Sequence, residues 1–209
     1  MNKNFALSAV LVFATGLGLA FAGVQEPALP GTPAAEVKQE DPKAREFKDI
    51  LFKLVRQDEY LDEALETIDA SNGRMSAHDL SAMGLSLKMI SNNLRYVASR
   101  NKAEFHAVQP GSPNARYINT IFSYSRKVNR KAGRVGALVA LMAAKNKKRA
   151  AMRDAVSSRK GGKKVKGKKI AQILEEQKAM DALAADAREL RAASRGLNAT
   201  SKWLYIAAK

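Results

Sequence analysis

Residues 80–97, LSAMGLSLKMISNNLRYV, carry the clearest helical pattern in this chain of 209 residues. The apolar residues follow one another in steps of three and four, which places them on one face of a helix. Upstream, Asn72-Gly73 is a helix-breaking pair, and Ser76 with Asp79 three residues later is a variant of the capping box. The pattern therefore predicts a helix over about 77–101. Its buried face comprises Leu80, Met83, Leu87, Ile90, Leu94 and Val97.

The same apolar spacing extends on both sides of this segment and predicts three more helices, over about 43–70, 114–156 and 168–197. Leu174 and Leu183 are among the apolar positions predicted for the buried seam of the last of these helices. A Lys/Gly-rich loop at 157–168 separates the last two, and no segment has the alternating pattern of a strand. The apolar stripes are narrow and alanine is frequent. We therefore expect an all-α fold, an antiparallel four-helix bundle with coiled-coil-like packing, as a single domain over 43–209.

The N-terminal segment has the layout of a secretory signal peptide. A short basic start is followed by an apolar stretch that ends in Ala20-Phe21-Ala22, which predicts cleavage after Ala22. Residues 23–42 hold four of the six prolines and too few apolar residues for a core, so they predict a flexible linker. We therefore expect a secreted or periplasmic protein.

The positive charge is concentrated in one segment. The chain carries 36 Lys and Arg against 20 Asp and Glu, a net charge of +16, yet 17 of these bases and a single acid lie within residues 126–169. The rest of the chain is balanced. On a helix the cations of this segment share one sector about 140° wide, opposite the apolar face. The candidate anion-binding residues are Arg126, Arg130, Arg134, Lys145, Lys148, Arg149, Lys163, Lys164, Lys166, Lys168 and Lys169.

A dense positive stripe attracts polyanions through counterion release. For an exported protein the possible partners are an anionic lipid surface, an envelope polymer or nucleic acid. Leu138 and Leu141 interrupt the cations, which slightly favours a membrane surface. The alternative is internal neutralisation, because the second half of the first predicted helix is strongly acidic. Its acids are Asp58, Glu59, Asp62, Glu63, Glu66 and Asp69.

A second hypothesis belongs to a different class, a structural or assembly protein. Here the apolar seams and the tail Trp203-Leu-Tyr-Ile206 would form a helix-mediated homo-oligomer. Enzymatic activity is not expected: the chain has no cysteine and two histidines, His78 and His106, and no serine or threonine has a recognisable His–acid constellation. Neither a cofactor nor a small-molecule substrate is predicted.

One segment between the first two predicted helices, Asp69–Leu80, resembles an EF-hand calcium loop. Gly73 matches the turn glycine and Asp79 the closing acid, and the loop is one residue short before the glycine. The weak metal candidates are therefore Asp69, Asn72 and Asp79, although a helix stop followed by an N-cap at Ser76 explains the same residues. We therefore predict no metal site, and a calcium-binding protein with a degenerate EF-hand-like loop is the minor alternative.

Overall fold

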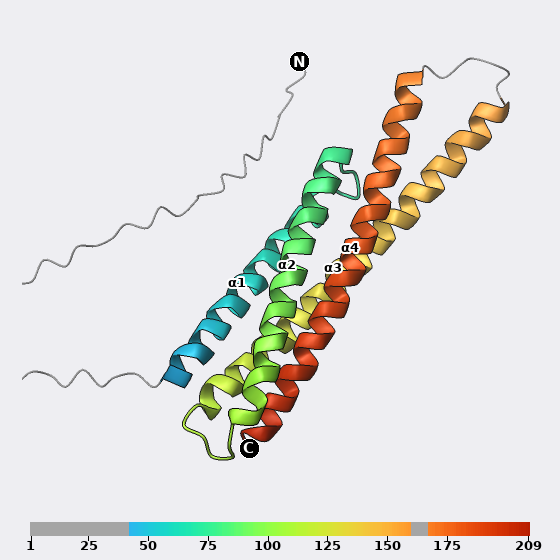
Figure 1. Cartoon of the computed structure of the whole chain (residues 1–209). Helices are drawn as coiled ribbons and strands as arrows, with labels where there is room; N and C mark the ends of the chain where they lie inside the picture. The colour runs from blue at the N-terminus through green and yellow to red at the C-terminus, as the bar shows by residue number, and fades with distance from the viewer. Residues whose placement is uncertain (1–41, 160–166) are drawn as a thin grey trace, which may run out of the picture. The chain divides into compact units, whose positions relative to one another are not determined.

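The computed structural model describes residues 42–159 and 167–209, with side chains described for 42–152 and 171–209. It contains four α-helices, 90% of these residues being helical, and no strand occurs in the described ranges. The predicted all-α class with four packed helices is confirmed (Figure 1). The signal peptide, residues 23–41 of the predicted linker and residues 160–166 of the predicted Lys/Gly-rich loop lie outside the described residues, whereas Pro42, residues 157–159 and residues 167–168 are helical. The helices are α1 (Pro42–Ala70), α2 (Ala77–Glu104), α3 (Ala115–Arg159) and α4 (Gly167–Ala207), with a 3₁₀ turn η1 (Phe105–Ala107) after α2.

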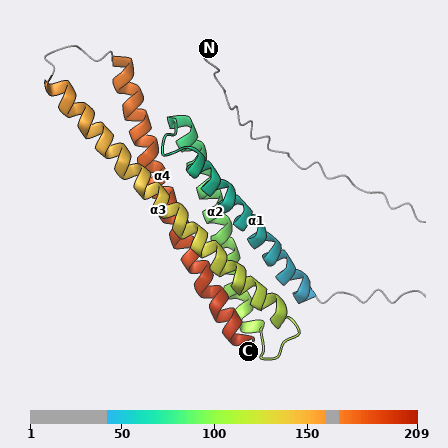
Figure 2. The same cartoon turned by 180° about the vertical axis from the view of Figure 1, so that it is seen from behind.

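The helices pack in the cyclic order α1, α2, α4, α3, as contacts and the two views show (Figures 1 and 2). The prediction of antiparallel packing holds for α1 with α2 and for α3 with α4. Between these two pairs, however, the neighbours run parallel. In the α2–α4 contact, Gly84 lies beside Asp186 and Asn101 bonds to Ser201, so residue numbers rise together along both helices. The parallel α1–α3 contact brings the acids of α1 beside the cations of α3.

The core follows the predicted apolar seams. All six apolar positions predicted for the helix over 77–101 are buried on α2, and Leu87, Leu94 and Val97 are fully enclosed. Leu174, assigned from the sequence to the seam of the fourth helix, was predicted wrongly because it is 60% exposed. It lies about 180° around α4 from the buried Leu183, on the side facing away from the core.

The fourth helix also ends later than predicted. It continues past Leu197 to Ala207 and includes the segment that the sequence suggested as a separate tail. Ser201 and Leu204 continue the buried seam, while Trp203 and Ile206 are exposed. The polar Ser201 hides this continuation from an apolar pattern, and its burial is accommodated by a hydrogen bond from the Asn101 side-chain amide to its hydroxyl at 2.9 Å.

The second half of α3 and the first part of α4 extend beyond the turn that joins α1 to α2 (Figure 1). At that turn, Gly73 has a positive φ of 73°, and a β-carbon there would lie 4.0 Å from Cγ of Met142. Met142 is the last buried residue described on α3, and Met180 is the first on α4. We call residues 141–159 of α3 and 167–179 of α4 the distal helix pair, and the remaining four-helix part the bundle body.

Candidate anion-binding face of α3

Cations of α3 in the bundle body are neutralised by the acids of α1. The Lys131 ammonium lies 2.6 Å from a carboxylate oxygen of Asp58 and 2.6 Å from one of Asp62. Lys127 reaches the other oxygen of Asp58 at 2.7 Å, and this hydrogen bond raises the pKa of Lys127. The side chain of Asp58 is only 7% exposed, so its carboxylate depends on these two cations for its stability.

Arg134 is the last cation of α3 that meets α1. Its guanidinium lies 3.5 Å from the carboxylate of Asp69, one residue before α1 ends at Ala70. Arg126 and Arg130, also predicted as anion-binding residues, are exposed on the same helix, and the Arg126 guanidinium lies 5.9 Å from the centre of the Phe122 ring. The predicted face is thus partly occupied within the bundle body.

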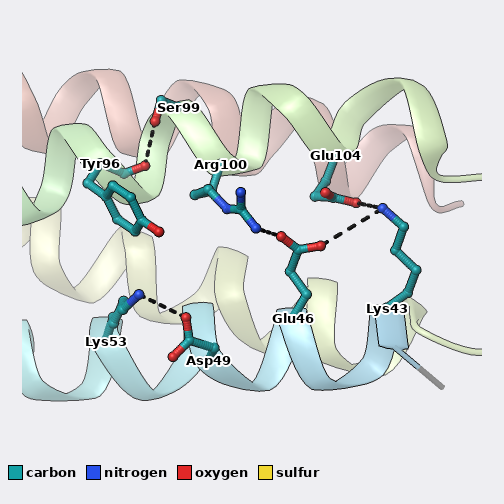
Figure 3. Close-up of polar contacts among 8 residues, drawn as sticks. All are labelled: Lys43, Glu46, Asp49, Lys53, Tyr96, Ser99, Arg100 and Glu104. Carbon is teal, nitrogen blue, oxygen red and sulfur yellow. Dashed lines mark hydrogen bonds and ion pairs between the residues drawn. The ribbon is translucent and has the colours of Figure 1, made fainter. Parts of the chain in front are cut away.

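The first half of α1 forms ion pairs with α2 instead (Figure 3). Lys43 lies 2.6 Å from Glu104, and Arg100 pairs with Glu46. Because these pairs join α1 to α2, the charges at this end of the hairpin are largely satisfied between its two helices. The acids available to α3 are therefore those of the second half of α1.

The distal helix pair has a different charge environment. Lys145, Lys147, Lys148 and Arg149 are all exposed, and none forms an ion pair within the described part of the chain. Helix α1 ends at Ala70, about three turns of α3 before Lys145, so it supplies no acid here. Asp154, whose side chain is not described, is the only acid in the remainder of α3.

A small hollow lies between the two helices of the distal pair. Arg149 and Asn146 of α3 line it together with Ile173, Glu176 and Gln177 of α4. Its volume of about 60 Å³ leaves room for a few water molecules. It is far below the roughly 300–1,000 Å³ typical of sites for organic ligands.

The remaining predicted cations belong to the loop and to the start of α4. Lys163, Lys164 and Lys166 lie outside the described residues. Lys168 and Lys169 belong to the first turn of α4, and their side chains are not described. Their part in anion binding stays a prediction.

Residues of the EF-hand-like segment have other partners. The Asp79 carboxylate accepts hydrogen bonds from the backbone N–H and the hydroxyl of Ser76, at 3.3 and 2.7 Å, and completes a capping box at the start of α2. Asp69 pairs with Arg134, and Asn72 adopts a φ of 50° in the turn. Within residues 42–152 and 171–209, no group of three or more His, Asp or Glu side chains is arranged to hold a metal ion. The geometry agrees with the helix-stop and N-cap explanation.

Two apolar side chains are also exposed on the part of α3 that belongs to the distal helix pair. Leu141 is 57% exposed and Met152 is 61% exposed. Leu138, by contrast, is half-buried against the core. Met152 was not among the predicted site residues, because a single methionine among cations and alanines has no distinguishing pattern.

None of the described helices is long and apolar enough to cross a membrane. Comparison with protein-family models, with curated proteins and with solved structures gives no match to this chain. The exposed and unpaired cations Lys145, Lys147, Lys148 and Arg149 of α3 are the feature of the described structure that suggests a function.

Proposed function

We propose that this is an exported, non-enzymatic helical protein that binds an anionic partner through the exposed cations of α3. One observation carries the proposal: α1 neutralises Lys127, Lys131 and Arg134 and then ends, which leaves the cluster Lys145–Arg149 exposed without ion pairs in the described structure. A protein gains little stability from four neighbouring like charges, which repel one another. Binding a polyanion would replace that repulsion with attraction and release counterions.

The mechanism is electrostatic, with weak selectivity among anions. A membrane surface, an envelope polymer and nucleic acid all satisfy it, and the lysines of residues 160–169 would enlarge the positive region. The two helices of the distal pair would hold the cluster on a stiff support. Because long lysine side chains adapt to irregular anions, we expect affinity without a fixed register.

Neutralising the cluster tests the proposal. We expect the affinity for heparin and for anionic vesicles to fall by roughly several hundredfold, since each of the four cations contributes about 1 kcal/mol near an anionic surface. The variant carries Gln at Lys145, Lys147, Lys148 and Arg149. The matched control loses the same four charges elsewhere on the bundle, at Arg45, Lys102, Arg195 and Lys202, all exposed.

The control separates a local site from overall charge. We expect it to bind within about threefold of the unmodified chain, because these four cations are spread over other helices. For the unmodified chain, binding should weaken more than a hundredfold between about 50 and about 500 mM salt. Equal losses in the two variants, or affinity that does not change with salt, would contradict the proposal.

Export is the second part of this proposal and rests on the sequence of residues 1–22. Mass spectrometry of the protein recovered outside the cytoplasm should find Gly23 as its first residue. A protein that keeps Met1 and stays in the cytoplasm would refute it.

Helix-mediated self-association is the alternative function. It is favoured by the exposed apolar side chains at the end of α4, Trp203 and Ile206, and along α2, where Leu85 and Tyr96 are exposed. Light scattering at micromolar concentration tests it: a dimer or larger species supports assembly, and a strict monomer removes it.

A further inference from the structure

The distal part of α3 presents two apolar side chains and two cations on one side. Leu141, Lys145, Lys148 and Met152 fall within a sector of about 60° at 100° per residue. Leu141 and Met152 are separated by about 16 Å along the helix axis. Both are more than half exposed, and the two lysines lie between them. Along this face, an apolar side chain is followed by two basic ones and then by a second apolar one.

This side of α3 is the exposed edge of its contact with α1 in the bundle body, where the side chains of Lys127 and Arg134 are still 50% and 65% exposed. Lys127 and Arg134, which pair with α1, lie within about 40° of Leu141 around the helix. Since α1 ends beside Arg134, nothing described covers the same side from Leu141 onward. Leu141 and Met152 thus lie on a side of α3 that is exposed in both regions, and they continue the row of charged residues on that side.

A soluble polyanion would use only half of this face. Sulfated sugars and phosphodiester chains are bound by cations, and they offer nothing apolar to a leucine or a methionine. Nucleic-acid stacking would need aromatic side chains, and this sector has none. An anionic bilayer provides both chemistries, because its headgroups attract lysine and its acyl chains accept apolar side chains just below them.

We propose, building on the proposed function, that the anionic partner is a phospholipid bilayer on which the distal part of α3 lies flat. Leu141 and Met152 enter the boundary between headgroups and acyl chains. Lys145 and Lys148 extend along the surface and place their ammonium groups among the phosphates. The proposed binding is association with one leaflet of the bilayer.

Leu174 provides the matched control. It belongs to the same distal pair and is 60% exposed, as Leu141 and Met152 are. On α4, however, it faces away from the core and lies outside the sector of Leu141, Lys145, Lys148 and Met152; the exposed Lys178 lies one turn later, and the exposed Glu175 is the next residue. Losing Leu174 should therefore have little effect on membrane binding.

The first experiment compares vesicles with a soluble polyanion. The chain from Gly23 is titrated with vesicles of equal parts phosphatidylglycerol and phosphatidylcholine, and separately with heparin. We expect the double variant Leu141→Ser/Met152→Ser to bind vesicles about tenfold more weakly and heparin within about twofold. Leu174→Ser should match the unmodified chain in both assays. Circular dichroism verifies that each variant keeps its helix content.

The outcomes separate this inference from the proposed function. If the variant with Gln at Lys145, Lys147, Lys148 and Arg149 binds heparin and vesicles as tightly as the unmodified chain does, the proposed function fails. If that variant loses both activities while the Leu141→Ser/Met152→Ser variant keeps full vesicle affinity, the bilayer inference fails and a soluble or wall polyanion remains. Equal weakening by Leu174→Ser would also overturn the assignment to the α3 face.

A fluorescent reporter gives a direct test of insertion. Trp203, the single tryptophan, lies near the other end of α4 and is first replaced by Phe. In that background, Leu141→Trp should show a blue-shifted emission with anionic vesicles and quenching by lipids brominated near the headgroup. Leu174→Trp should show neither change. An unshifted Leu141→Trp that still cosediments with the vesicles would refute insertion.

Discussion

Lys127 and Lys145 lie on the same side of α3, about five helical turns apart, and have opposite environments. Lys127, in the bundle body, pairs with the nearly buried Asp58 of α1. Lys145, in the distal helix pair, is exposed and has no ion pair among the described residues. A basic helix face thus contributes to helix packing where a neighbouring helix supplies acids, and its cations are available to a partner where that neighbour ends.

The largest expected difference between the two regions is the loss of stability when a leucine is replaced by alanine. Leu190 of α4 is fully enclosed in the bundle body, whereas Leu141 is 57% exposed. We expect Leu190→Ala to lower the free energy of unfolding by about 2–5 kcal/mol, because it leaves a cavity in the core. Leu141→Ala should change it by less than about 0.5 kcal/mol. Urea unfolding followed by circular dichroism measures both, and a large loss for Leu141→Ala would show that the distal pair is part of the core.

A smaller effect is expected at the carboxylate that anchors α3 to α1. Asp58→Asn removes the shared partner of Lys127 and Lys131, and we expect a loss of about 1–3 kcal/mol in the free energy of unfolding. The adjacent Glu59 is exposed, so Glu59→Gln should change stability by less than about 0.5 kcal/mol. Thermal unfolding of the two variants decides. Equal effects would mean that α1 acts through general charge and not through this contact.

The smallest expected effect is a pH dependence at Asp186, where α4 packs on α2. Burial raises the pKa of this carboxyl, Glu189 raises it further, and Lys88 opposes the shift. The close neighbour is Gly84, where a β-carbon would lie 2.8 Å from Oδ2 of Asp186. Because the folded-state pKa lies above the ordinary value of 3.8, the stabilisation from the neutral carboxyl is complete below that value. It is lost as the pH rises through the folded-state pKa.

Asp186→Asn should therefore raise the melting temperature slightly at pH 7 and leave it unchanged at about pH 3. The exposed Asp181→Asn on the same helix serves as the control. A variant at Asp186 that is less stable at pH 7 would show that the ionised carboxylate makes a favourable contact.

Most of the helical architecture was predictable because helix periodicity is local. The six apolar positions of α2 were identified from spacing alone, and the capping box at Ser76 marks the start of that helix. The end of α4 was missed because Ser201 interrupts the apolar pattern, and its burial depends on Asn101, a hundred residues away in sequence. Leu174 was misplaced because a short apolar run does not reveal which of its members has a neighbour to pack against.

For the candidate site, the residue pattern alone was enough to locate the positive charge on one segment and on one side of one helix, because both follow from composition and the 100° turn per residue. It also left open whether the acids of the first helix neutralise that charge. The answer depends on how the helices pack, because it requires the parallel α1–α3 contact and the end of α1 beside Arg134. Which helices pair, and where one of them ends beside the other, depends on residues far apart in sequence. These two properties separate the neutralised lysines of α3 from the exposed ones.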